Sequence, residues 1–202
     1  MRATLDLSKQ FQLQLSVVNG WDSVLDENAL KTVNLSLYFK HPSIEAPRTE
    51  LSLHYYGGPE APASTHSEAW RSLFDLSLIH RFEKSRLSFN AVYGLDGVGG
   101  KRVQWYGAAL QGQLDVTDWL RLAMRLEYFG DPDGVRTALT YGGGLVPVTD
   151  LGLTGFTFTV GFPIAKRAEI RLEARHDYAS QLIFRGDSQH QTTLTTGVLA
   201  FF

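Results

Sequence analysis

Hydrophobic and polar residues alternate along most of the chain, and this period-two pattern predicts β-strands with two unlike faces. In the last eleven residues, one face carries Leu194, Val198 and the final residue, Phe202. An alternating strand that ends a chain on an aromatic residue is typical of outer-membrane β-barrels. We expect eleven strands, at Arg2–Leu7, Phe11–Val18, Thr32–Lys40, Thr49–Tyr56, Trp70–Arg81, Arg86–Leu95, Gln104–Leu114, Trp119–Gly130, Leu153–Pro163, Ala168–Tyr178 and Gln189–Phe202.

The connections between these strands alternate in length. The short ones are Ser8–Gln10, His41–Arg48, Phe82–Ser85, Asp115–Asp118 and Ile164–Arg167. The long ones are Asn19–Leu30, Gly57–Ala69, Asp96–Val103, Asp131–Gly152 and Ala179–Ser188. Short turns on one side and longer loops on the other are typical of membrane barrels. We therefore predict an all-β, antiparallel up-and-down transmembrane β-barrel of about 10–11 strands.

Aromatic residues gather near both ends of the expected strands, as they do at the two interfaces of a membrane. Near the long loops lie Tyr55, Trp70, Tyr93, Tyr106, Tyr128 and Tyr178. Near the short turns lie Phe39, Phe82, Trp119, Phe162 and Phe202. We predict two aromatic girdles, although a general preference of aromatic residues for strands is an alternative explanation.

Charged residues share one face of two strands near the C-terminus. They are Arg121, Arg125, Glu127, Arg171, Glu173, Arg175 and Asp177. Because an arginine at the bilayer midplane costs about 2–4 kcal/mol, this face must be wet or fully paired. Small residues between the two strands, at Thr157, Thr159 and Gly161, leave room for pairing across about 10 Å. An internal ion-pair ladder is favoured over an ion-selective pore lining, and both stay open.

The composition excludes several classes of function. The net charge of −2 gives no basic face for a nucleic acid, and the chain has no cysteine. No apolar run is long enough for a transmembrane helix. The six histidines lack zinc spacing and no nucleophile elbow is present, so we expect no metal, no cofactor and no enzymatic activity. Gly97–Arg102 lacks phosphate-loop spacing, and Asp131–Gly134 is expected to be a turn rather than a calcium loop.

Several segments match a known pattern: Val17–Asp22, Arg125–Phe129, Asp131–Thr137, Arg171–Asp177 and the terminal Phe202. The most specific are Asn-Gly-Trp-Asp in the first segment and Asp-Pro-Asp-Gly-Val-Arg in the third. Together they resemble the bacterial OmpL-like β-barrel porin family over most of the chain. The resemblance implies an outer-membrane barrel that passes small solutes and has no catalytic residues.

Members of that family are typically about twice this long. We therefore expect residues 1–202 to form a single barrel domain that is truncated at its N-terminus, without the signal peptide and the first strands. If Arg2–Val18 is one long strand, the count is even and the sheet can close. If it is a stub and a strand, an edge remains open in lipid at high cost. We expect a closed barrel or a strongly curved open sheet.

The leading functional hypothesis is a porin-like barrel of the bacterial outer membrane that lets small hydrophilic solutes diffuse. The alternative is a structural or surface-binding barrel with a plugged, ion-paired interior. A membrane-embedded lipid enzyme and a soluble β-barrel are less favoured, and the latter would point Leu120, Leu122 and Leu126 inward. The expected partners are outer-membrane lipid, the solutes and the outer-membrane assembly machinery, which we expect to recognise Phe202 as its signal.

Overall fold

The computed structural model describes residues 1–19, 31–45, 47–59, 70–98, 100–141, 144–164, 167–185 and 187–200. Within these ranges the chain forms strands, turns and bends. The strands are β1 (Arg2–Asp6), β2 (Phe11–Val18), β3 (Thr32–His41), β4 (Thr49–Pro59), β5 (Trp70–Arg81), β6 (Ser85–Val98), β7 (Lys101–Thr117), β8 (Leu120–Asp131), β9 (Ala138–Tyr141), β10 (Gly144–Pro147), β11 (Leu151–Ile164), β12 (Ala168–Ala179) and β13 (His190–Ala200).

The predicted fold class is confirmed. Eleven strands form one up-and-down sheet in the order β1-β2-β3-β4-β5-β6-β7-β8-β11-β12-β13. Pairing is antiparallel from β1 through β4 and from β8 through β11 and β12 to β13. Among the described residues, β1 and β13 are the two ends of this order. The eleven strands are those that the alternation predicts, with ends that differ by a few residues.

The chain divides into two compact units, which we describe separately. The first unit comprises Met1–Leu78 and Asn90–Tyr106. Its first segment is not one long strand, because β1 folds back on β2 with Arg2 opposite Ser16. The turn between them is closed by Leu7 N–H and Ser8 N–H, which both donate to the Phe11 carbonyl. The sequence left open whether Arg2–Val18 is one strand or two, and the structure has two, which makes the strand count of the sheet odd.

The connection between β6 and β7, also in the first unit, is shorter than the sequence predicts. The expected long loop over Asp96–Val103 is wrong, because β6 continues to Val98 and β7 begins at Lys101. Gly100 has a φ of +78°, a left-handed conformation that glycine adopts without a Cβ penalty. The two strands are hydrogen-bonded neighbours in the sheet, and only two residues of sequence separate them.

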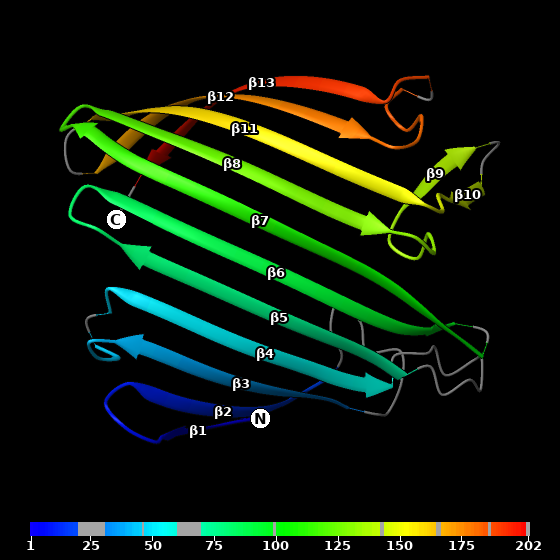
Figure 1. The fold of residues 1–202 in the computed structure, drawn as a ribbon, viewed down its shortest axis with the longest axis horizontal. Coiled ribbons are helices and arrows are strands. Elements are labelled where there is room, and N and C mark those ends of the chain that lie inside the picture. The colour runs from blue at the N-terminus through cyan, green and yellow to red at the C-terminus, as the bar shows by residue number, and fades with distance from the viewer. Residues whose placement is uncertain are drawn as a thin grey trace. The chain divides into compact units, whose positions relative to one another are not determined.

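The second unit comprises Ile79–Phe89 and Gly107–Phe202, and in it β8, β11, β12 and β13 follow one another (Figure 1). Thr157 of β11 pairs with Arg125 of β8 and with Arg175 of β12, which fixes the register of the three strands. The sequence missed the small hairpin of β9 and β10, which lies within the connection expected over Asp131–Gly152.

Asp131 organises the base of that connection. Its buried carboxylate accepts hydrogen bonds from the backbone N–H groups of Val135, Arg136 and Thr137, at 2.8–3.0 Å, and from the Thr137 hydroxyl at 2.7 Å. Gly134 has a φ of +66°, as the turn requires. The segment is the predicted turn, and its carboxylate oxygens are occupied by these donors.

Burial in this protein is the reverse of that in a soluble core. Among the described residues the buried hydrophobic side chains are Trp105, Leu151 and Ala179. The buried polar and charged ones are Ser16, Thr32, Asn34, Ser36, Asp96, Asp131, Thr157, Glu169 and Asp177. Large apolar side chains such as Met124 and Leu126, by contrast, are 53% and 54% exposed. Soluble proteins bury polar groups far less often than apolar ones, so the exposed apolar face calls for a nonaqueous surrounding.

Candidate functional site: a charged sheet face across β8, β11 and β12

Strand β11 provides a floor of small residues on one face of the second unit. Gly155, Thr157, Thr159 and Gly161 alternate along this face. Each lies in register between one residue of β8 and one of β12. Because strands are about 4.8 Å apart, side chains of β8 and β12 can meet over β11 only if its own side chains are small. This is the arrangement that the sequence predicts for Thr157, Thr159 and Gly161.

One ion-pair network lies at the end of the face near the β11–β12 turn. Arg121 Nε donates to Asp115 Oδ1 at 2.6 Å, and Arg121 Nη1 donates to Glu169 Oε2, also at 2.6 Å. The other oxygen of Glu169 accepts from Arg171 Nε at 2.5 Å. Glu169 is only 2% exposed, so its carboxylate is shared by two arginines in a site that water barely reaches. Charge-assisted bonds of this kind are the strongest hydrogen bonds that side chains make.

A second network lies at the other end of the same face. Arg175 Nε donates to Asp177 Oδ2 at 2.9 Å, and Arg175 Nη2 contacts both Asp177 and Glu127. Arg125 Nε lies 3.1 Å from Glu127 Oε2 and forms an ion pair with it. Glu127 therefore joins the arginine of its own strand to that of β12. All four arginines named from the sequence lie against carboxylates.

Glu173 occupies the level between the two networks. It pairs in register with Thr159, whose hydroxyl donates to Glu173 Oε2 at 3.1 Å. The residue of β8 at this level is Ala123, which carries no charge. Among the described residues of this face, Glu173 thus differs from the other carboxylates, each of which pairs with an arginine.

Two glycines of β11 are required by the side chains above them. A Cβ on Gly155 would lie 2.8 Å from Arg175 Nη2 and 2.9 Å from Glu127 Cγ. A Cβ on Gly161 would lie 2.7 Å from Glu169 Oε1. The missing side chain at each glycine thus leaves the space into which the side chains of one ion-pair network pack.

Sequence reasoning missed two members of this face, Asp115 and Glu169. Asp115 was assigned to a turn, but β7 extends to Thr117 and places this carboxylate beside Arg121. Glu169 lies two residues before Arg171, so the same alternation that identified Arg171 also carries it.

In the first unit, strands β2, β3 and β4 bury a set of neutral polar groups. Asn34 Oδ1 accepts hydrogen bonds from the hydroxyls of Ser16 and Ser36, at 3.0 and 3.1 Å. His54 Nδ1 lies 2.8 Å from Ser36 Oγ, which extends the network to β4. These residues were not among the candidates from sequence, because neutral polar positions on an alternating strand look the same whether they are solvated or buried.

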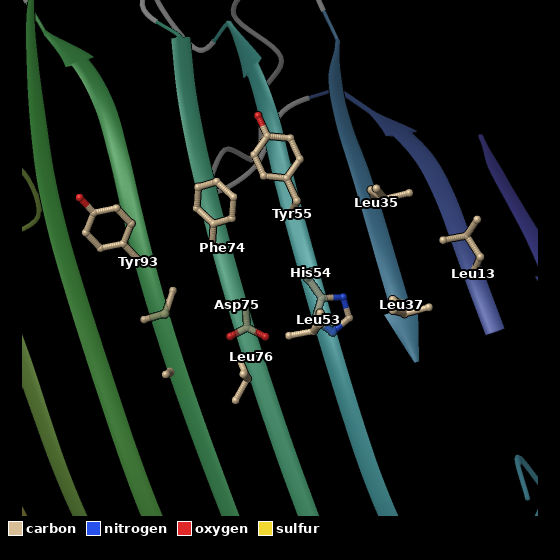
Figure 2. Close-up of a pocket in the computed structure, with 12 residues that line it drawn as sticks. Leu13, Leu35, Leu37, Leu53, His54, Tyr55, Phe74, Asp75, Leu76 and Tyr93 are labelled. Carbon is tan, nitrogen blue, oxygen red and sulfur yellow. The ribbon is translucent and has the colours of Figure 1, made fainter. Parts of the chain in front are cut away.

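The other face of the first unit is apolar and contains a groove of about 530 Å³. Figure 2 shows Leu13, Leu35 and Leu53 on neighbouring strands, with Tyr55 and Tyr93 directing their hydroxyls toward one end. Tyr93 donates to Gln104 Oε1 at 2.7 Å, and Trp70 Nε1 donates to Ser72 Oγ at 3.1 Å. The aromatic side chains near this end therefore have polar tips with polar partners.

The aromatic residues predicted as girdles are placed as follows. Of the set near the long connections, Trp70, Tyr93, Tyr106, Tyr128 and Tyr178 are exposed and Tyr55 is half-buried. Of the set near the short turns, Phe82 and Trp119 are exposed, Phe39 and Phe162 are half-buried, and Phe202 lies outside the described residues. Tyr128 and Tyr178 both pair with Thr154, so they lie at one level of the sheet. Whether these rings sit at a membrane interface stays a prediction.

Among the described residues, no group of three or more His, Cys, Asp or Glu side chains is arranged to hold a metal ion. The same residues contain no helix with the length and hydropathy needed to cross a membrane.

Comparison with known proteins decides the family. The family described as "Putative beta-barrel porin-2, OmpL-like" matches residues 1–202. The chain belongs to this family. Its resemblance to OmpL-like porins, stated above from short segments, is thereby confirmed. No curated protein matches the chain.

A solved structure supports the fold of this OmpL-like chain. It is similar to a porin structure refined at 1.8 Å resolution, with a TM-score of 0.63 and 10% sequence identity. The match covers 99% of this chain and 60% of the porin chain. At this identity the likeness shows the porin-like fold alone, and the chain spans about 60% of the porin's length.

Proposed function

We propose that this chain forms wall strands of an outer-membrane pore through which small hydrophilic solutes diffuse passively. The observation that carries the proposal is the opposite chemistry of the two faces of the second unit. One face buries Thr157, Glu169 and Asp177, and the other exposes Met124 and Leu126. In a membrane barrel, residues alternate between lipid and the interior in this way.

The dimensions of β11 fit a bilayer. Thr154 lies at the level of Tyr128 and Tyr178, and Phe162 lies at the opposite end of the apolar face. The eight residue steps between them span about 27 Å along a strand. With the usual tilt of 35–45°, this gives an apolar band of about 20 Å, close to the roughly 25 Å of outer-membrane barrels.

The charged face contributes a mixed lining in which arginines and carboxylates alternate. Three of its ion pairs, Arg121–Asp115, Arg121–Glu169 and Arg175–Glu127, join different strands and stiffen the sheet. Glu173 lies between the two networks and supplies a negative charge that, within the described part of the chain, is met by the Thr159 hydroxyl and by no arginine. We propose that it gives the pore a weak preference for cations, as acidic side chains do in other pores.

Planar-bilayer recording of the full-length protein tests the proposal. We expect stepwise conductance that is absent from detergent controls and from protein denatured before addition. A KCl gradient is expected to give a reversal potential of the cation-selective sign, and Glu173→Gln is expected to move it toward zero. Correctly inserted protein without conductance above the lipid background would refute the pore.

A structural or surface-binding barrel is the second candidate. It is favoured by one observation, the pairing of all four arginines with carboxylates. Under this alternative the barrel inserts and is stable but does not conduct, and the β8–β11 connection binds a partner. The bilayer recording separates the two candidates, because insertion and conductance are measured on the same sample.

A further inference from the structure

Two histidine rings face each other across β12 and β13. His190 Nδ1 lies 3.4 Å from His176 Nε2, and the ring centroids are 5.5 Å apart. In the register of the two strands, His176 pairs with Thr192 and His190 pairs with Tyr178, so the histidines are diagonal neighbours. They lie on the exposed face of the second unit, opposite the arginines and carboxylates.

Both rings are held in place by other residues. Thr192 Oγ1 lies 2.9 Å from His176 Nδ1, and the Tyr178 ring packs against His190 with centroids 5.0 Å apart. His190 N–H donates to Ser188 Oγ, whose hydroxyl in turn donates to the His190 carbonyl. Ligands that are positioned before binding lose less entropy when they bind.

The geometry of the two nitrogens is that of metal ligands. Two imidazole nitrogens bound tetrahedrally at about 2.0–2.1 Å from one ion lie roughly 3.4 Å apart. When His176 Nδ1–H donates to Thr192, the lone pair of His176 Nε2 points toward His190. A hydrogen bond from the second ring nitrogen commonly fixes the tautomer of a metal-binding histidine in this way. His190 offers its Nδ1 lone pair when its own proton lies on Nε2. Both rings can therefore bind an ion in their neutral form without releasing a proton.

We propose that His176 and His190 bind a divalent late transition ion of the zinc or copper class, with water completing its coordination. Imidazole suits these ions, and copper is expected to bind more tightly than zinc. The ion would join β12 to β13, an end strand in the order of the sheet. The two rings lie on the face that the proposed barrel turns toward lipid, and His190 pairs with Tyr178 at the tyrosine level, so the ion would be held at the polar edge of the apolar band. The site is tested by metal binding and the pore by conductance, so the failure of one is distinguishable from the failure of the other.

Calorimetric titration of the full-length protein in detergent micelles, with Cu²⁺ or Zn²⁺ at about pH 7.5, tests the site. We expect His176→Ala and His190→Phe each to weaken binding at least tenfold, since each removes one of two ligands. The phenylalanine keeps a ring against Tyr178, so it tests the nitrogen rather than the packing. Thr192→Val is expected to weaken binding by a smaller factor. His80→Ala removes a histidine outside the pair and is the matched control.

Electron paramagnetic resonance of the Cu²⁺-loaded wild-type protein gives a readout that needs no variant. We expect hyperfine coupling to two imidazole nitrogens, and to one nitrogen in His190→Phe. A spectrum with a single nitrogen in the wild type would overturn the proposal. So would unchanged affinity in both histidine variants, or the absence of binding in a sample with the normal β-sheet circular dichroism.

Discussion

Glu169 offers the sharpest test of the charged face, through the substitution Glu169→Gln. The side chain is almost fully buried and accepts from Arg121 at 2.6 Å and from Arg171 at 2.5 Å. The amide keeps the shape of the carboxylate but removes its charge and one acceptor. Removing one partner of a fully buried ion pair costs about 3–5 kcal/mol. Here the arginine side chains are 28% and 39% exposed, and Arg121 retains Asp115, so we expect about 2–3 kcal/mol.

Glu173→Gln is the matched control, because it makes the same chemical change on the same face of the same strand. Glu173 accepts from the Thr159 hydroxyl, and the amide oxygen of glutamine can still do so. We expect the control to cost about 1 kcal/mol or less.

Reversible unfolding in urea, with the protein folded into lipid vesicles, measures both variants. For a denaturant slope of about 2 kcal/mol/M, Glu169→Gln is expected to lower the urea midpoint by about 1–1.5 M relative to wild type, and Glu173→Gln by about 0.5 M or less. Equal shifts in the two variants would refute the argument, since they would show that the shared carboxylate contributes no more than a single hydrogen bond.

Three further predictions concern the sheet and its connection. Gly155→Ala is expected to cost about 1–2 kcal/mol because its Cβ meets Arg175 and Glu127, whereas Gly197→Ala, with nothing within 4 Å, is expected to change stability by less than about 0.5 kcal/mol in the same urea assay. Met124→Arg, midway along the apolar face, is expected to lower stability in vesicles by about 2–4 kcal/mol, and Thr154→Arg, at the tyrosine level, by at most about 1 kcal/mol; equal costs would show that this face does not cross lipid. Asp131→Asn is expected to speed hydrogen exchange at the amides of residues 135–137 at least tenfold, read by mass spectrometry, while the amides of β12 keep wild-type rates; unchanged exchange at 135–137 would show that the carboxylate does not hold the turn.

Alternation along the sequence was sufficient to predict the eleven strands of the sheet and the two faces of β8 and β12. It was sufficient because the two faces of each strand meet different surroundings. Whether a residue has an odd or an even position along the strand then decides which face it lies on. Alternation does not show where a strand stops. The ends of β6 and β7 were therefore placed too early, and Asp115 was assigned to a turn rather than to the charged face.

Other parts of the structure depend on contacts that no local pattern reports. Asn34 is buried where its side chain meets Ser36 of its own strand and Ser16 of the neighbouring strand β2, and the contact with Ser16 cannot be read from the sequence around Asn34. The β9–β10 hairpin follows a turn rich in Pro and Gly. A loop without strands can have the same composition, so the composition does not predict the hairpin. Alternation along β12 places Glu169 on the charged face, but its burial depends on the space that Gly161 leaves on the neighbouring strand β11.

The closed base of the β8–β11 connection makes this region suitable for peptide grafting. The Asp131 carboxylate fixes the chain as far as Thr137, and Thr137 and Val148 exchange hydrogen bonds before the strand β11 begins. The ends of the β9–β10 hairpin are thus held by contacts that do not involve its tip. A foreign epitope inserted between Tyr141 and Gly144 would be displayed from an anchored stem, with the register of β8 and β11 left to their own pairing.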